Sequence, residues 1–311
     1  MMIPHIPHKN SSISRQNLSL KSTYSSSKMS LINSPPTNPS KPFDSPYVRE
    51  HASSETLQAL DQLSQLPKPV IDLKSFPPRS VAAVLILLHL VPGTGDLAVT
   101  LTTRSQRLSS HPGDTALPGG RVDSTDETVV ATALREANEE IGLPIEVMSQ
   151  YGYLGTLDPF LSRNLLVVYP VLYFYLQSPE ELLINLKANE DEVSEIFHLP
   201  LKDILEASPE NVDSIGSKLL YTSRDLKWIH GTTYRWHSFS SSSLPSPLTG
   251  LTADIIVSLV TFAYRTPNPG FGPVKAPGQE DWKTLIDWAL AGEAGKEGDQ
   301  HSIIRKTRPT V

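Results

Sequence analysis

The stretch that decides the fold is residues 104–143, RSQRLSSHPGDTALPGGRVDSTDETVVATALREANEEIGL. It joins a glycine loop, LPGG, to a segment whose apolar residues recur at helical spacing. These apolar residues are Val130, Leu134, Ala137 and Ile141. Ser124 and Glu127 have the spacing of a capping box, which predicts a helix over residues 125–140. Gly142 is placed to end that helix, and Pro144 prevents its continuation.

Three glutamates of this helix, Glu136, Glu139 and Glu140, fall within an arc of about 100° on a different face. With carboxylates about 5 Å apart and an effective dielectric near 20, each pair repels by roughly 3 kcal/mol. Arg135 offsets part of this repulsion. Full exposure to water would relieve the rest, and so would a divalent cation such as Mg²⁺, which prefers oxygen ligands. The preceding glycine loop favours the cation, because its backbone can approach a phosphate or a metal closely.

These residues resemble the Nudix box, whose pattern is G-x5-E-x7-R-E-U-x-E-E-x-G-U, with U an apolar residue. The matching positions are Gly120, Arg135, Glu136, Ala137, Glu139, Glu140, Gly142 and Leu143. Gly120 and Arg135 are one residue farther apart than in the general box. Two acids therefore compete for the middle position: Asp126 when counted from Gly120, and Glu127 when counted from Arg135.

The upstream half of the stretch resembles the coenzyme A diphosphatase branch of that family, which carries the longer spacer. The residues that match the branch signature are Leu101, Arg104, Ser105, Leu108, His111, Gly113, Pro118, Gly119 and Gly120. The resemblance covers about residues 81–265 and includes GLTADI at residues 250–255, similar to the terminal helix of the branch.

The resemblance implies metal-dependent hydrolysis of the diphosphate bond of coenzyme A or its derivatives. The products would be adenosine 3′,5′-bisphosphate and (acyl-)4′-phosphopantetheine. Two alternatives stay open: a Nudix hydrolase acting on another nucleoside diphosphate derivative, such as ADP-ribose or NADH, and a non-catalytic nucleotide-binding Nudix module.

The resemblance also implies roles for the box residues. Glu136 and Glu140 are expected to be the principal ligands of Mg²⁺ or Mn²⁺, and the Gly120 carbonyl to complete the metal site. Glu139 is expected to act as a further ligand or as general base, and Arg135 to orient a carboxylate. The acidic run at residues 190–192 supplies a second candidate base, Glu192; the alternative is an exposed acidic loop.

Substrate binding is expected at Arg104, Arg107 and His111, together with Gly119 and Gly120 of the loop. The alternative places Arg104 at the surface end of a strand and makes His111 a hydrogen-bond partner that structures its loop. The segment WIHGTTYRW, residues 228–236, either stacks on adenine or forms an edge strand that fills the core.

The Nudix resemblance implies an α/β fold with a mixed β-sheet sandwiched between α-helices. Strands are predicted at residues 81–91, 97–104, 151–157, 165–176 and 234–239, the first two as a hairpin. Helices are predicted at residues 53–66 and 251–264, with shorter ones within 201–207 and 280–290. The expected division is a disordered extension at 1–50, a helix and linker at 51–74, the Nudix domain at 75–265, and a largely flexible tail at 266–311.

Composition narrows the function further. The chain has 311 residues, a net charge of −6 and no cysteine, which excludes disulfides and thiolate metal sites and gives no reason to expect a nucleic-acid binder. Its longest apolar runs are too short for a spanning helix, so no membrane partner is expected. No zinc-site spacing is found among the nine histidines, and no G-x-S-x-G motif occurs. The expected partner is a small-molecule substrate.

The N-terminal composition bears on localisation. Residues 1–43 contain eleven serines, five Lys or Arg and no acidic residue, similar to a mitochondrial transit peptide, but with a single arginine. A cytoplasmic or mitochondrial location is expected. The family includes peroxisomal members, but the chain ends in RPTV, which is not a peroxisomal signal.

Overall fold

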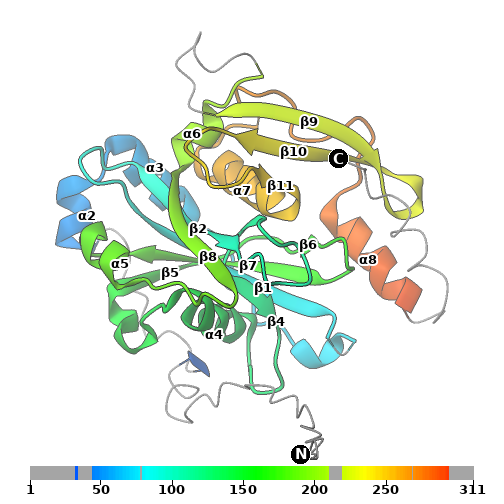
Figure 1. Ribbon diagram of the computed structural model, residues 1–311, viewed down its shortest axis with the longest axis horizontal. Helices are drawn as coiled ribbons and strands as arrows, with labels where there is room; N and C mark the ends of the chain where they lie inside the picture. Colours follow the sequence, from blue (N-terminus) through cyan, green and yellow to red (C-terminus); the bar gives the residue numbers. More distant parts are fainter. Residues whose placement is uncertain (1–31, 34–43, 78, 210–218, 268, 294–311) are drawn as a thin grey trace, which may run out of the picture.

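The chain forms a mixed β-sheet with helices on both faces and a second, three-stranded sheet beside it (Figure 1). This confirms the predicted α/β fold with a mixed β-sheet between α-helices. The computed structural model describes residues 32–33, 44–77, 79–209, 219–267 and 269–293. Most of the predicted extension at 1–50 and residues 294–311 of the predicted tail lie outside these ranges.

The main sheet contains eight strands: β1 (Val81–Leu90), β2 (Leu97–Arg104), β3 (Thr115–Ala116), β4 (Gly119–Arg121), β5 (Tyr151–Thr156), β6 (Phe160–Leu161), β7 (Val167–Tyr175) and β8 (Val193–Pro200). Strands β1 and β2 form the predicted hairpin, and β1 runs parallel to β7 from the pair Val81–Val167 to the pair Leu88–Phe174. Both β1 and β7 are buried on both faces, which explains their continuous apolar sequences.

Alternate residues of β1 belong to different core layers. Ile86 and Leu88 pack in one apolar cluster with α3 (Ser54–Ser64) and α7 (Gly250–Ala263). Leu85 and Leu87 pack in a second cluster with α4 (Val129–Ile141). Helix α4 therefore covers one face of the sheet, and α3 and α7 cover the other (Figure 1).

The N-terminal helices belong to this same core. Helix α3 confirms the predicted amphipathic helix, since Ser53 caps it and Leu60 and Leu63 are fully buried. Helix α2 (Pro46–His51) corrects the predicted disorder of residues 46–50. Its Val48 is fully buried, and the Ser45 hydroxyl that caps it donates to the Leu176 carbonyl at 2.6 Å.

Helix α4 begins later than the capping box predicted. Thr128 caps it, its hydroxyl oxygen accepting from the Ala131 N–H at 3.0 Å. The Ser124 hydroxyl instead donates to the Asp123 carboxylate, and residues 124–127 lie before the helix. The C-terminal prediction is confirmed, because Gly142 adopts a left-handed φ of 65°.

The second sheet was predicted only in part. It consists of strands β9 (Leu220–Lys227), β10 (Thr233–Ser240) and β11 (Leu248–Thr249). Strand β10 confirms the strand predicted at residues 234–239, but it lies in the middle of this sheet rather than at an edge, and β9 and β11 were not predicted. The connection between β9 and β10 contains the short turn η5 (Ile229–Gly231). Strand β9 was not predicted because most of its side chains are exposed and its sequence shows no apolar alternation.

The remaining short elements are α5 (Pro179–Asn185), α6 (Leu201–Leu205), η2 (Leu73–Ser75), η3 (Ile145–Gln150) and α8 (Trp282–Glu293). Helix α8 confirms the short helix predicted within residues 280–290, and its packing corrects the expectation of a largely flexible tail for this segment. Leu285 and Ile286 are buried in the α4-side cluster, and Trp282 packs on Phe160 with ring centroids 5.1 Å apart. Apolar burial therefore holds this part of the tail on the domain.

Candidate active site

The glycine loop reaches α4 because β4 pairs with the first half of β1, with Gly120 opposite Ala83. A Cβ on Gly119 would lie 2.4 Å from the Ala83 carbonyl oxygen, so only glycine fits there. A Cβ on Gly120 would lie 2.5 Å from the carboxyl carbon of Glu136. The loop and the first glutamate of the REANEE run are therefore in direct contact.

Arg135 is the centre of the charged cluster. Its Nε and Nη2 donate to the two carboxylate oxygens of Asp126 at 3.0 and 2.9 Å, and Nη2 also donates to the Arg121 carbonyl at 3.1 Å. Its Nη1 lies 2.9 Å from an oxygen of Glu136 and 3.0 Å from one of Glu139. One guanidinium thus ties the preceding loop to two glutamates of the helix.

The middle acid in contact with Arg135 is Asp126. Its side chain has 0% exposure, and it also accepts from the Asp123 N–H at 2.9 Å and the Thr132 hydroxyl at 3.0 Å. Glu127 is exposed, and none of the described hydrogen bonds joins its side chain to Arg135. The acid that pairs with Arg135 is therefore the one found by counting forward from Gly120, and not the one found by counting back from Arg135.

Glu140 lies deepest of the three glutamates and accepts from the Gly119 N–H at 3.0 Å. Burial raises the pKa of Glu140 to about 8 and that of Glu136 to about 7. Burial also raises the pKa of Glu139. Negative neighbours, Glu192 among them, raise all three pKa values further. Without a cation, these carboxyls therefore hold their protons to higher pH than an ordinary glutamate does.

The donor chemistry of the cluster fits Mg²⁺ or Mn²⁺, since it offers several buried or half-buried carboxylate oxygens beside a backbone loop. As they stand, no three acidic or histidine side chains of the described ranges are arranged to hold a metal ion. The reason is their present pairing: Glu136 and Glu139 turn toward Arg135, and Glu140 toward Gly119. Metal binding would require these carboxylates to exchange partners.

The acidic run at residues 190–192 is joined to the loop that follows β2. Ser105 donates from its N–H to the Glu192 carbonyl at 2.9 Å and from its hydroxyl to the Glu190 carbonyl at 3.2 Å. Arg107 and Asp191 form an exposed ion pair at 3.1 Å. Of the run, Glu192 is the residue whose charge acts on the pKa of the box glutamates.

The residues expected to bind substrate differ in how they lie relative to the glutamate cluster. Arg104 ends β2, and its charge lowers the pKa of Glu140, so it lies beside the cluster. Its Nη2 donates to the Ser110 carbonyl at 3.3 Å, while its buried Nε has no hydrogen-bond partner within the described chain. His111 instead has a positive φ of 54° and contacts Asp114 at 3.0 Å, the loop-structuring arrangement.

Sequence reasoning missed Asn33, whose side chain contacts the loop before α4 from 92 residues away. No motif at Asn33 signals this contact. The aromatic segment at residues 228–236 packs instead against the C-terminal helix, with the Trp228 and Trp282 ring centroids 6.1 Å apart. Its aromatic residues Trp228, Tyr234 and Trp236 are half-buried.

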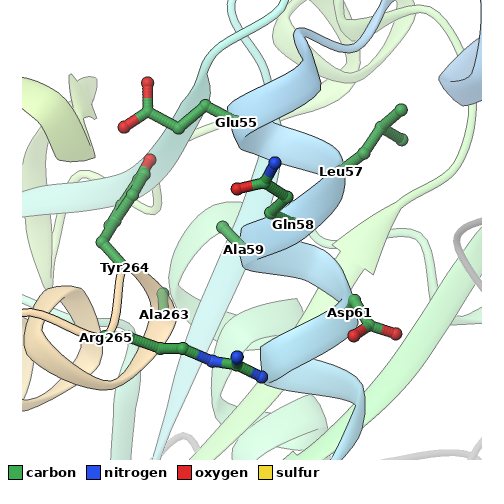
Figure 2. Close-up of a pocket in the computed structure, with 8 residues that line it drawn as sticks. All are labelled: Glu55, Leu57, Gln58, Ala59, Asp61, Ala263, Tyr264 and Arg265. Atoms are coloured by element: carbon green, nitrogen blue, oxygen red, sulfur yellow. The ribbon is translucent and has the colours of Figure 1, made fainter.

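A pocket of about 600 Å³ lies elsewhere, between α3 and the end of α7 (Figure 2). Its lining includes Glu55, Asp61, Tyr264 and Arg265. Because α3 and α7 cover the sheet face opposite α4, this pocket is separate from the glutamate cluster. Within the described ranges, every helix is too short or too polar to cross a membrane.

Comparison with known proteins gives consistent results. The NUDIX domain family model matches residues 79–220. Nudix hydrolase 15, mitochondrial, of Arabidopsis thaliana is 32% identical over 202 residues, 64% of each chain. Nudix hydrolase 22, chloroplastic, of the same plant is 33% identical over 199 residues, so the chain spans less than two thirds of either plant protein, 64% and 59%.

A bacterial relative is covered more fully. The protein named "Uncharacterized Nudix hydrolase NudL" of Escherichia fergusonii is 38% identical over 153 residues, 49% of this chain and 73% of that protein. Among solved structures, the NUDIX domain of Shewanella oneidensis NrtR complexed with ADP ribose is 27% identical, with a TM-score of 0.32 over 43% of this chain and 81% of that one. By its sequence matches, the chain belongs to the Nudix hydrolase family.

Proposed function

We propose that the chain is a metal-dependent diphosphatase acting on coenzyme A or its derivatives. It would release adenosine 3′,5′-bisphosphate and (acyl-)4′-phosphopantetheine. The observation that supports this choice is the position of Arg104. This residue belongs to the upstream signature of the coenzyme A diphosphatase branch, and it ends β2 close enough for its charge to lower the pKa of Glu140, which itself accepts from the glycine loop.

Nudix hydrolases generally use divalent metal ions such as Mg²⁺. Here Glu136, Glu139 and Glu140, with the Gly120 carbonyl, would hold Mg²⁺ or Mn²⁺. When bound, such an ion neutralises charge on the diphosphate and lowers the pKa of a coordinated water. The metal also supplies the counter-charge that the buried glutamates lack, so they can stay ionised at neutral pH.

The chain's own residues would do the rest of the chemistry. The oxygen of water attacks one phosphorus, the bond from that phosphorus to the bridging oxygen breaks, and the second phosphate leaves with the bridging oxygen. A carboxylate must accept the proton of the attacking water, and Glu139 and Glu192 are the two candidates. Arg135 would keep the glutamates oriented, and Arg104 would bind phosphate oxygens.

The catalytic unit we assign is residues 75–265. Residues 269–293 pack on it, and the α2–α3 segment shares its core. The serine-rich segment at 1–43 and the plant relative named as mitochondrial support a mitochondrial location. Imaging of the full chain with a C-terminal fluorescent tag would test this; a purely cytoplasmic signal would contradict it.

Steady-state hydrolysis of coenzyme A, ADP-ribose and NADH, measured in parallel with Mg²⁺ or Mn²⁺, tests the proposed reaction. The wild type should prefer coenzyme A, and both EDTA and Glu140→Gln should abolish turnover. Equal or better turnover of ADP-ribose would contradict the substrate and retain the metal chemistry. Absence of metal-dependent turnover with all three would favour a binding module.

A further inference from the structure

Ile32 and Asn33 lie far ahead of the Nudix domain in sequence but contact the loop before α4. The Asn33 side-chain amide donates from Nδ2 to the Thr125 carbonyl at 3.2 Å, and the Glu127 N–H donates to its Oδ1 at 3.2 Å. The adjacent Ile32 side chain is only 3% exposed and belongs to the α4-side apolar cluster. An apolar anchor therefore accompanies the two hydrogen bonds.

The two hydrogen bonds bracket one residue, Asp126. Asn33 contacts the backbone on both sides of it, at Thr125 and Glu127, and so limits rotation of the intervening residue. The segment needs such support because it precedes the first turn of α4 and is not part of a helix or strand. Without the Asn33 amide, the Thr125 carbonyl and the Glu127 N–H would turn to water.

We propose that Asn33 is a positioning residue of the active site. By fixing the backbone around Asp126, it keeps the Asp126 carboxylate in its ion pair with Arg135. Arg135 in turn holds Glu136 and Glu139 beside the glycine loop. Asn33, which lies outside the Nudix box, thus sets the geometry of the carboxylates within it. The inference rests on the proposed metal-dependent function in taking these carboxylates as metal ligands.

The test uses the full chain with Asn33→Ala, and with Asn185→Ala as a matched control at an exposed site on α5. Amide hydrogen exchange of peptides covering residues 121–132 is measured without metal, and Mn²⁺ binding is measured by calorimetry. Loss of two hydrogen bonds should speed exchange in these peptides roughly three- to tenfold and weaken Mn²⁺ binding by a similar factor. Asn185→Ala should match the wild type in both.

A second comparison separates positioning from general destabilisation. If Asn33 acts through Asp126, Asn33→Ala should weaken Mn²⁺ binding no further in an Asp126→Asn background. Unchanged loop exchange and Mn²⁺ binding in Asn33→Ala, or full additivity with Asp126→Asn, would overturn the proposal. Should Asn33→Ala not fold, Asn33→Asp, which keeps the oxygen acceptor for Glu127 and loses the donor to Thr125, is measured in its place.

These readouts are independent of the substrate. A wild type that hydrolyses none of the three diphosphates, with Mn²⁺ binding that still depends on Asn33, contradicts the proposed function and supports the role of Asn33. Normal coenzyme A hydrolysis by Asn33→Ala, with unchanged Mn²⁺ binding and exchange, supports the proposed function and overturns the role of Asn33.

Discussion

Asp126 and Arg135 form a two-point ion pair in which each carboxylate oxygen accepts from a different guanidinium nitrogen, at 3.0 and 2.9 Å. The Asp126 side chain is completely buried, so this carboxylate has no access to water. The pair leaves Nη1 of the same guanidinium directed at Glu136 and Glu139. The orientation of two candidate metal ligands therefore depends on a residue that precedes their helix.

Asp126→Asn should be both less stable and less active than the wild type. Removing the charge of one partner in a buried ion pair costs about 3–5 kcal/mol, and groups that orient metal ligands contribute about 10- to 100-fold to activity. Urea unfolding and kcat for coenzyme A measure the two effects. Glu127→Gln, at the exposed competing position, is the control and should stay within about 0.5 kcal/mol of the wild type. Equal effects of the two substitutions would contradict the assignment of Asp126.

The part of the site that sequence could predict is the part fixed by helical spacing. Arg135, Glu136, Glu139 and Glu140 lie on one uninterrupted helix, so their relative placement follows from 3.6 residues per turn. The burial of β1 and β7 could likewise be predicted from the sequence, because parallel strands covered on both faces have continuous apolar sequences.

The start of α4 was mispredicted because a tertiary contact overrides a local signal. A capping box at Ser124 and Glu127 would stabilise an earlier first turn by about 1 kcal/mol. That turn competes with the Asp126–Arg135 pair and with the Asn33 contacts to the loop backbone. Contacts over such sequence separations leave no periodic pattern, which is also why Asn33 itself went unpredicted.

Gly120→Ala should weaken metal binding while leaving β4 intact. Its added Cβ would lie 2.5 Å from the Glu136 carboxyl carbon and displace this side chain, whereas the Gly120 backbone does not require glycine. We expect about tenfold weaker Mn²⁺ binding by calorimetry and a lower thermal midpoint. If the clash is the cause, Glu136→Ala should restore the midpoint of the Gly120→Ala protein. A double variant as unstable as the single one would contradict this explanation.

Arg104→Ala should raise KM for coenzyme A more than Arg107→Ala does. Arg104 lies beside Glu140 and has a buried Nε without a hydrogen-bond partner in the described chain, whereas Arg107 forms an exposed ion pair with Asp191. A lost charge-assisted hydrogen bond to a phosphate weakens binding by roughly ten- to a hundredfold. Steady-state kinetics of both variants decide the order. A larger KM increase for Arg107→Ala would move the phosphate site toward residues 190–192.

The metal-free protein should lose stability as pH rises from 6.5 to 8.5. The pKa of Glu136 is raised to about 7, and those of Glu140 and Asp254 to about 8, mainly by burial. In the unfolded chain these carboxyls ionise near pH 4, so the folded state binds more protons in between. Stability then falls with rising pH, by at most about 1.4 kcal/mol per pH unit for each carboxyl.

The histidines titrate mostly below this window, and their effect has the opposite sign. Burial lowers the pKa of His198 and His237 to about 4, so their contribution to stability grows from pH 4 through the unfolded pKa of 6.5 and is nearly complete at pH 7.5. Thermal midpoints at pH 6.5, 7.5 and 8.5 are measured with and without saturating Mg²⁺, and the step from 7.5 to 8.5 reports the carboxyls without the histidines. Metal should remove the decrease due to Glu136 and Glu140, since it binds their ionised forms, and leave the decrease due to Asp254. Glu140→Gln should likewise flatten the metal-free profile and be more stable than the wild type at pH 8.5, because it places no charge at that buried position. A metal-free wild type whose midpoint is constant across the window would show that these glutamates are already ionised and balanced by Arg135 without a cation.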